Sequence, residues 1–416
     1  MIIDIINVMP FKTQIIYLVK RLLLFYNKLK KNNVTRHDVK PYKVYWISPE
    51  KIVYHTNYIS ENQPETTSYA HRVIPKNMRG MILDGDWDKS TYPITELINY
   101  KSIKQRIIDG SDWKDTEIYK WHLNIINNRE LFNNKKFWGI DTEKDLINRC
   151  DYLDEIISDI KNNGYELNIN KFDNLDYGEI DVNIGRDGEY LFQDGRHRLS
   201  ISKILNICKI PVFVFCRHKE WQKYRSYLYD CLGSMPNNEF IVNLIHPDLN
   251  HISYDERSEE VFNNLIKNFS IKNGKILDMN PINGYYCHRL ETLGYDCYLY
   301  DEDEIKISLI NKLKKYENKK FSVINNEFNN EDVNRLEPDI ILYLFTDYNY
   351  SENKIDIIMS QIETNLNLKE LYLQFIDIKN KNQVINIKNN IVNNTRYNKY
   401  KKIYEKSDNC VYKIFL

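Results

Sequence analysis

The sequence has no excess of either charge, no closely spaced cysteine pair and no long hydrophobic run. Lys and Arg total 58 and Asp and Glu total 58, so the formal net charge is zero. A protein that coats nucleic acid needs an excess of basic groups to release counterions, so this balance excludes simple coating and leaves room for a local basic site. Hydrophobic residues make up 42% and aromatic residues 13% of the chain, which excludes general disorder.

The cysteines exclude two further classes of protein. There are seven, widely scattered and without CxxC spacing: Cys150, Cys208, Cys216, Cys231, Cys287, Cys297 and Cys410. An odd number in this pattern fits neither a disulfide framework nor a zinc site. We therefore expect a reducing compartment, the cytoplasm.

The first 41 residues predict a helical leader. In IIYLVKRLLLFYNKL (Ile15 to Leu29) apolar residues recur at the helical period, but Lys20 and Arg21 interrupt the run. No stretch reaches the about 18 apolar residues of a membrane span, and no small-x-small cleavage site follows. We favour a helix that packs on its own protein. Peripheral association with a membrane or a partner is the alternative.

A first domain is predicted over residues 42–231. It opens on a strand-like segment, Tyr42 to His55, and helical patterns with several Trp dominate from Ile94 to about Asn162, stopped by Gly164. A β-hairpin is predicted over Glu179 to Gln193, with EIDVNI and EYLFQ as its strands and GRDG as its turn. The charged turn DGRHR, a helix and the buried strand IPVFVFC follow.

The turn DGRHR (Asp194 to Arg198) predicts an anion site. It lies between a strand and a helix, so its N–H groups form a helix N-terminus that suits negative charge. Arg196 and Arg198 supply donor forks for phosphate, His197 can donate or shuttle a proton, and Arg217 could add a basic group from the next strand end. The alternative is a basic turn that pairs with nearby acids. Basic residues here oppose the helix dipole, which favours the anion site.

The segment LFQDGRHRLSISKILNICKIPVFV resembles the ParB/sulfiredoxin superfamily, whose signature is a strand, a Gly-x-x-Arg turn and a helix before an "IPV" strand. That resemblance implies an α+β domain whose turn binds nucleotide phosphates, ATP or CTP with magnesium, through Gly195, His197 and Arg198. It also makes His197 a candidate catalytic residue. The cysteine of sulfiredoxin is absent from this turn, so sulfinic-acid repair is not expected.

The cluster LDGDWDKSTYP places three carboxylates, Asp84, Asp86 and Asp88, at alternating positions. They could hold a magnesium ion or act as a base against a bound nucleotide. The alternative is an acidic surface turn, which alternating Asp residues around Gly usually form. Trp87 favours a turn that is pinned to a core.

After a linker at 232–252, residues 253–416 alternate strands with helices and end in a hairpin. This order predicts a parallel doubly wound sheet closed by an antiparallel pair. Leu277 to Gly284 forms a strand–loop–helix unit, which places a ligand at the strand's carboxyl end. Asp301, 23 residues after Asp278, ends the next strand, where an acid commonly binds ribose hydroxyls.

ILDMNPINGYY resembles the first motif of class I S-adenosylmethionine-dependent methyltransferases. The resemblance implies a Rossmann-like domain that binds S-adenosylmethionine through Asp278, Asn280, Gly284, Asp301 and Asn326, with Asp347 as a candidate catalytic residue. Asn280 stands where the family has its first glycine. Asn is the residue other than glycine best able to take a positive φ.

The predicted fold is α/β: a ParB/sulfiredoxin-like α+β domain followed by a Rossmann-like doubly wound domain of the methyltransferase type. The first hypothesis is a methyltransferase whose first domain binds a nucleotide or phosphate-bearing substrate, with nucleic acid allowed but not required. The alternative is a nucleotide-dependent kinase or hydrolase that acts at DGRHR beside a non-catalytic methyltransferase-like domain. A third is a nucleotide-gated binding module.

Overall fold

The computed structural model describes residues 43–59, 71–128, 139–167, 179–233, 246–250, 256–279, 281, 283–325, 335–344, 363–376, 399–406 and 409–415. The chain divides into two compact units, one ending at Lys223 and the other beginning at Tyr224, so the boundary falls inside helix α7 (Lys219–Gly233). The predicted leader and most of the predicted linker lie outside the described residues. No helix within the described ranges is both long and apolar enough to cross a membrane.

The unit that ends at Lys223, unit 1, is a mixed sheet with helices. Its strands are β1 (Val44–Ile47), β2 (Ile52–His55), β3 (Ile82–Leu83), β4 (Ile180–Ile184), β5 (Tyr190–Asp194) and β6 (Ile210–His218). Its α-helices are α3 (Ile98–Ile107), α4 (Glu117–Asn127), α5 (Glu143–Asn163) and α6 (Arg196–Ile204). Short 3₁₀ helices are η1 (Pro49–Lys51), η3 (Lys76–Met78), η4 (Ile94–Glu96) and η5 (Trp113–Asp115).

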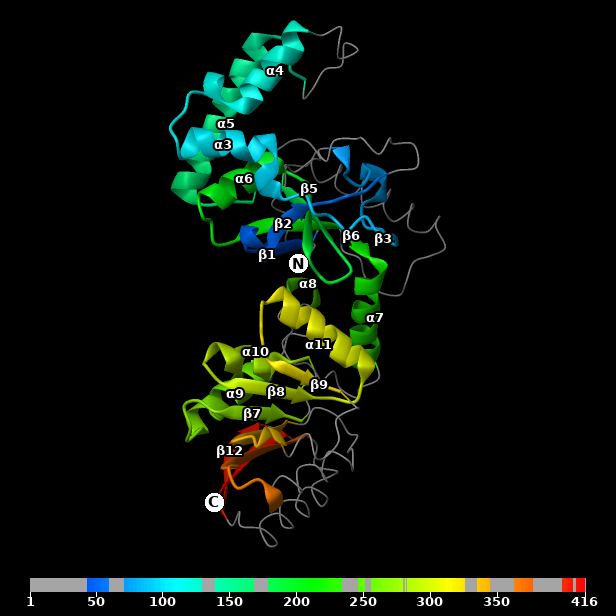
Figure 1. Ribbon diagram of the computed structural model, residues 1–416, viewed down its shortest axis with the longest axis vertical. Coiled ribbons are helices and arrows are strands. Elements are labelled where there is room, and N and C mark those ends of the chain that lie inside the picture. The colour runs from blue at the N-terminus through cyan, green and yellow to red at the C-terminus, as the bar shows by residue number, and fades with distance from the viewer. Residues whose placement is uncertain are drawn as a thin grey trace. The chain divides into compact units, whose positions relative to one another are not determined.

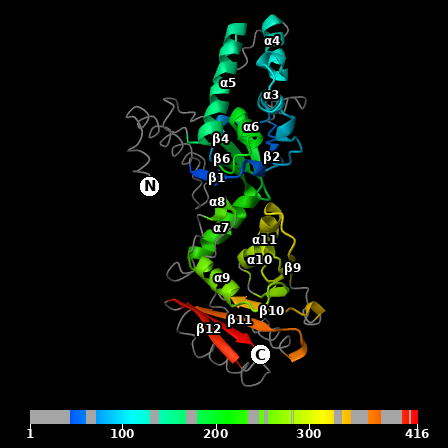
Figure 2. The ribbon, with the colours of Figure 1, turned by 90° about the vertical axis from the view of Figure 1, so that its left-hand side faces the viewer.

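The strand order in unit 1 is β1-β6-β4-β5-β2, with β3 also paired to β6. The central strands β4 and β6 are buried along their whole length, which explains the uninterrupted apolar run IPVFVF. The predicted hairpin is confirmed as the antiparallel pair β4 and β5. Helices α3, α4 and α5 gather at one end of the unit (Figures 1 and 2), and both α3 and α5 contact α6.

The strand-like segment at the start of this unit differs from the expectation of one strand. Ser48 caps η1 through its side chain and Pro49 begins that helix, so the segment breaks into β1 and β2. Proline lacks the N–H that a strand needs for its ladder, and its fixed φ suits the first position of a helix. As a result β1 pairs with β6, whereas β2 pairs with β5 at the opposite edge of the sheet.

The unit that begins at Tyr224, unit 2, alternates helices and strands. Its helices are the second part of α7, α8 (Pro247–Asn250), α9 (Glu256–Asn268), α10 (Tyr285–Thr292) and α11 (Glu304–Tyr316). Its strands are β7 (Lys275–Asp278), β8 (Asp296–Tyr300), β9 (Ser322–Ile324), β10 (Ile340–Leu344), β11 (Glu370–Ile376), β12 (Lys399–Lys406) and β13 (Asn409–Phe415).

The sheet of unit 2 has the order β12-β13-β11-β10-β7-β8-β9. Strands β7 to β11 are parallel, and β13 is antiparallel to both β11 and β12. The predicted doubly wound parallel sheet with a closing antiparallel pair is therefore confirmed. The chain proceeds outward from β7 to β9 and then returns to place β10 on the other side of β7. This reversal between β7 and β10 is the topological switch point, where such sheets bind ligands.

Both faces of this sheet are buried. Successive residues of β10 alternate between two apolar cores, with Ile340 and Leu342 in one and Ile341 and Tyr343 in the other. The first core also contains side chains of α9, α10 and α11, so these helices cover that face. A strand covered on both sides reads as a continuous apolar run, as IILYL does.

Candidate functional site

Two carboxylates lie at adjacent strand ends beside the switch point of unit 2. Asp278 is the last residue of β7, and Asp301 directly follows β8, its parallel neighbour. The backbone N–H of Asp301 donates to the carbonyl of Ile324 at the end of β9 (3.3 Å), so three strand ends lie together at one edge. Asp278 is fully buried and Asp301 is 2% exposed. The structure thus brings together the two acids that the sequence singled out.

The loop after β7 turns into α10 at Gly284, which has a φ of 78° and forms the N-cap of that helix. The side chain of Asn283 accepts a hydrogen bond from the N–H of Tyr285 (2.9 Å) and so closes the turn. A Cβ on Gly284 would face Leu299 and Ile310 at ordinary contact distances. The positive φ is a backbone conformation that favours glycine at this position. Asn280, Asn326 and Asp347 lie outside the described residues.

The buried Asp278 has a thiol beside it. The Sγ of Cys287 on α10 lies 3.9 Å from Oδ2 of Asp278. A hydrogen bond with Cys297, burial and the nearby Asp278 raise the pKa of the Cys287 thiol well above its usual value. This thiol is therefore protonated at neutral pH, and it acts as a weak donor to Asp278 rather than as a nucleophile.

Asp301 is oriented by its own loop. Its Oδ1 accepts hydrogen bonds from the N–H groups of Glu302 (2.8 Å) and Asp303 (2.9 Å). Its Oδ2 lies 4.0 Å from Nζ of Lys306, one turn into α11. Sequence reasoning missed Asp303 and Lys306, although the run of acids in YDEDE marks Asp303 as a helix N-cap.

His288, on α10, gives unit 2 a dependence on pH. The side chain is 2% exposed, packs edge-on against Phe321, and neither ring nitrogen has a hydrogen-bond partner among the described residues. Burial, with Lys319 nearby, lowers its pKa to about 3. The unfolded chain, with a His pKa of about 6.5, then binds the proton more readily than the folded protein does.

We therefore expect stability to fall as the pH drops below about 6.5. Between pH 7 and pH 5 this one group should remove about 2 kcal/mol from the free energy of unfolding. Urea denaturation at both pH values measures it, and His288→Phe should reduce the pH dependence by that amount. An equal pH dependence in wild type and His288→Phe would contradict this account.

In unit 1 the DGRHR turn joins β5 to α6 as the sequence predicts. Gly195 has a φ of 91° and is the N-cap of α6, which has no side-chain cap. A Cβ on Gly195 would lie 3.0 Å from Cα of Ile180 and 3.1 Å from the carbonyl oxygen of Glu179. The absence of a side chain at Gly195 thus lets the turn pack closely against β4. The N–H groups of the first turn of α6 are the donors that could meet an anion.

His197 lies between two helices of the segment that precedes the hairpin. Its Nε2 is 2.9 Å from Nδ2 of Asn99 on α3, and its Nδ1 is 3.4 Å from a guanidinium nitrogen of Arg149 on α5. Burial and the nearby charges of Arg149 and Arg196 lower the pKa of His197 well below its usual value. At neutral pH the imidazole is therefore uncharged, and it serves as a hydrogen-bonding group rather than as a cation.

Sequence reasoning missed Asn99 and Arg149 because they are 98 and 48 residues from His197 along the chain. Neither lies in a motif, and only the packing of α3 and α5 against α6 brings them to the turn. Burial lowers the pKa of the Arg149 guanidinium. A desolvated cation at this position favours a negatively charged ligand.

The remaining residues predicted for this site separate into two places. Asp194 ends β5 opposite Asp181 of β4, and Arg198, 9% exposed, is in the first turn of α6. Arg217 pairs instead with Ile184, at the other end of β4. It is fully buried and donates to the hydroxyl of Tyr45 (3.2 Å). The structure does not bring Arg217 to the turn.

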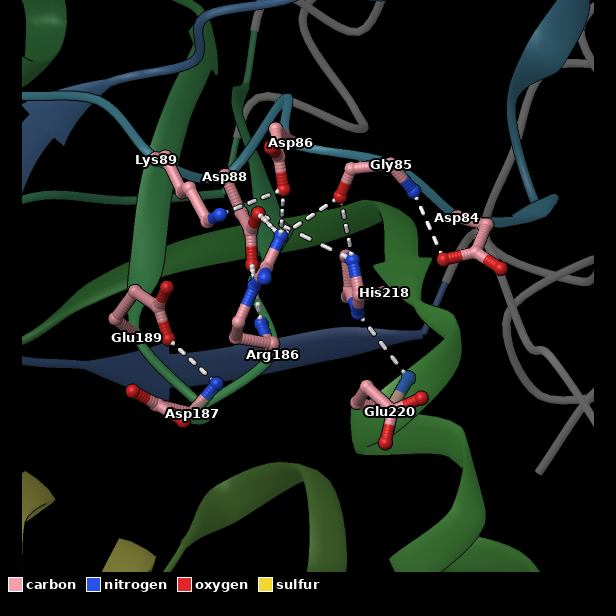
Figure 3. A network of polar contacts seen from close by, with 10 residues as sticks. All are labelled: Asp84, Gly85, Asp86, Asp88, Lys89, Arg186, Asp187, Glu189, His218 and Glu220. Carbon is pink, nitrogen blue, oxygen red and sulfur yellow. Dashed lines mark hydrogen bonds and ion pairs between the residues drawn. The ribbon is translucent and has the colours of Figure 1, made fainter.

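Each of the three DGDWD carboxylates contacts a cation of the protein itself, and Figure 3 shows those of Asp86 and Asp88. Arg186 of the hairpin turn contacts Asp88 through Nε (2.8 Å) and a terminal nitrogen (2.7 Å), and contacts Asp86 at 2.8 Å. Asp84 pairs with Lys219 at 2.9 Å. Trp87 is 5% exposed and belongs to a core, as its position in the turn suggests. This arrangement pins the turn to the hairpin.

Glu189 adds a titratable group to the same network (Figure 3). Its carboxylate accepts a hydrogen bond from the N–H of Asp187 (2.9 Å). Burial, together with the charges of Asp187 and Asp88, raises the pKa of Glu189 to about 7. Across the described ranges, no group of three His, Cys, Asp or Glu side chains is placed to hold a metal ion. The magnesium site stays a prediction.

No protein-family model matches this chain, and no curated protein matches its sequence. Among solved structures, similar ones include WbdD, described as a bifunctional kinase-methyltransferase, at 15% identity and a TM-score of 0.31. The match covers 45% of this chain and 46% of WbdD, so the chain spans about half the length of that protein.

Of two further similar structures, one is described as a methylase and the other as a complex with AdoMet. A putative rRNA-methylase from Clostridium thermocellum matches at 10% identity and a TM-score of 0.29, over 38% of this chain and 95% of that chain. TYW2 of M. jannaschii, in complex with AdoMet, matches at 15% identity and a TM-score of 0.28, over 39% and 76%. The likeness concerns the fold alone, and at these TM-scores it carries no argument about function.

Proposed function

We propose that unit 2 binds S-adenosylmethionine and is a methyltransferase. The observation that carries the proposal is that Asp278 and Asp301 lie at adjacent strand ends beside the switch point, where the loop after β7 makes its tight turn at Gly284. In a doubly wound sheet this is where a nucleoside ligand lies, and a carboxylate after the second strand can bind both ribose hydroxyls.

The residues of this edge fit such a cofactor. Asp301 would hold the ribose, while Asp278, with the Cys287 thiol as its donor, and the Gly284 turn would shape the loop beneath the methionine moiety. When bound, S-adenosylmethionine supplies a methyl group on a positively charged sulfur. The protein's task is to bind and orient this group and to bring the acceptor into line with it.

The test is a calorimetric titration of the purified chain with S-adenosylmethionine, compared with its demethylated product. Saturable binding of both is expected. A wild-type protein that binds neither would refute the proposal. We propose further that unit 1 selects a nucleotide or phosphate-bearing methyl acceptor, which a screen for transfer of labelled methyl groups would identify.

A specific observation favours a second candidate, nucleotide-dependent phosphoryl transfer or hydrolysis at DGRHR in a ParB/sulfiredoxin-like unit 1. The turn combines the uncapped N-terminus of α6 with Arg149 from α5 and the uncharged His197. Titration with ATP and with CTP, each with magnesium, tests it. Nucleotide binding without turnover would favour the binding module over the kinase or hydrolase.

For this second candidate we expect Arg149→Met to weaken nucleotide binding about tenfold or more. A hydrogen bond to a charged group contributes about 1.5–3 kcal/mol, which corresponds to roughly ten- to a hundredfold in affinity. The measurement is the dissociation constant for whichever nucleotide the wild type binds. Lys144→Met, at an exposed position of the same helix, is the control and should bind normally. Unchanged affinity in Arg149→Met would remove Arg149 from the site.

A further inference from the structure

Two tyrosines of α7 reach α11 in unit 2. The hydroxyl of Tyr224 lies 2.7 Å from Oγ of Ser308, in the middle of α11. The hydroxyl of Tyr227 donates to Oδ2 of Asp303 at 3.1 Å, at the very start of that helix. Both contacts join the same pair of helices. Only the second reaches the loop that follows β8.

Asp303 links this contact to Asp301. Its Oδ1 accepts hydrogen bonds from the N–H groups of Ile305 (2.8 Å) and Lys306 (3.1 Å), so it is the N-cap of α11. Its own N–H donates to Oδ1 of Asp301 (2.9 Å). The orientation of Asp303 therefore sets both the start of α11 and one of the bonds that hold the Asp301 carboxylate.

The second oxygen of Asp301 depends on the same residue. Lys306, whose N–H is held by Asp303, places its ammonium group 4.0 Å from Oδ2 of Asp301. Asp301 is 2% exposed, so its carboxylate has little freedom to reorient into water. A small rotation of Asp303 would consequently shift the position from which Asp301 meets a ligand.

We propose that Tyr227 is a positioning residue of the methyl-donor site. Its hydroxyl fixes the side chain of Asp303, and Asp303 in turn fixes the carboxylate of Asp301 that receives the ribose hydroxyls. The inference rests on the proposed function of unit 2. It assigns to a helix outside the parallel sheet a share in recognising the ribose.

The test compares Tyr227→Phe with Tyr224→Phe, since each removes one hydroxyl from the same helix. Calorimetry gives the dissociation constants for S-adenosylmethionine and for its 2′-deoxyribose analogue, and thermal denaturation gives stability. In Tyr227→Phe we expect S-adenosylmethionine to bind about five- to thirtyfold more weakly, as for the loss of one hydrogen bond. The preference for the ribose form over the deoxyribose form should shrink as well. Tyr224→Phe should retain both properties.

A second variant tests the route through Asp303. Serine is as good an N-cap as aspartate but is too short to reach Tyr227, so Asp303→Ser should keep α11 and reproduce the Tyr227→Phe defect. If the two residues act as one unit, the double variant should be no weaker than the weaker single variant. Strictly additive losses would overturn the proposed route.

The possible outcomes distinguish a failure of the role proposed for Tyr227 from a failure of the proposed methyltransferase function. Wild-type binding that Asp301→Ala abolishes and Tyr227→Phe leaves intact would overturn the inference and keep the proposed function. Equal weakening in both tyrosine variants, with the ribose preference retained, would show a purely structural role and overturn it too. A wild-type protein that binds no S-adenosylmethionine would overturn both.

Discussion

Replacing Asp301 with alanine is expected to weaken S-adenosylmethionine binding by at least about a hundredfold. Two hydrogen bonds from ribose hydroxyls to a carboxylate would be lost, each contributing about 1.5–3 kcal/mol. Asp301→Asn should lose less, because the amide oxygen can still accept from the N–H groups of Glu302 and Asp303. Isothermal titration of the three proteins measures the series.

The matched control is Asp296, an exposed acid at the opposite end of the same strand, β8. Asp296→Ala removes the same charge from unit 2, and its one side-chain contact among the described residues is with the hydroxyl of Tyr298 (3.0 Å). It should bind S-adenosylmethionine as the wild type does. Normal binding by Asp301→Ala would show that this carboxylate does not hold the ribose.

Breaking the buried ion pair of Arg225 and Asp248 is expected to cost about 3–5 kcal/mol of unfolding free energy. Arg225 on α7 contacts Oδ1 of Asp248 on α8 at 2.9 Å and its carbonyl oxygen at 2.6 Å, and both side chains are fully buried. Arg225→Met leaves the buried Asp248 carboxylate without this guanidinium. The double variant Arg225→Met with Asp248→Leu should recover most of the loss, since no charge remains buried.

Chemical denaturation of the single and double variants checks this expectation. A surface pair of unit 2 provides the comparison: Lys402 and Glu405 lie 2.9 Å apart with both side chains well exposed. Lys402→Met should change stability by no more than about 1 kcal/mol. If Arg225→Met cost as little as Lys402→Met, the pair would not stabilise the contact between α7 and α8.

The sequence predicts the sheet of unit 2 better than it predicts the surroundings of either site. Short apolar runs such as KILD and IILYL, separated by helical periods, are sufficient to indicate a parallel sheet, because strands covered on both faces must be apolar throughout. The two acids, Asp278 and Asp301, follow from the same pattern since each stands at a strand end. Their meeting at one edge needs only the rule for doubly wound sheets.

Contacts between helices leave no pattern in the sequence from which they could be predicted. Tyr227, Asn99 and Arg149 belong to ordinary helical stretches, and each reaches its partner through the way one helix packs on another. Arg217 shows the converse. It follows an apolar run as a surface charge would, yet it is buried beside the far end of β4, where it donates to the hydroxyl of Tyr45. The break of the first strand at Ser48 and Pro49 could have been predicted from the sequence, since proline has no N–H to donate to the hydrogen bonds of a β-sheet.

The two edge strands of the sheet in unit 2 affect how readily copies of the protein associate through their sheets. An edge strand offers unpaired N–H and C=O groups to any other extended chain, which is the first step of β-aggregation. One edge, β9, has three residues, too few to template a partner. The other, β12, has eight residues and carries exposed lysines at positions 399, 401 and 402. A second copy that approached this edge would bring like charges together, so unit 2 resists growth into stacked sheets despite its many apolar strands.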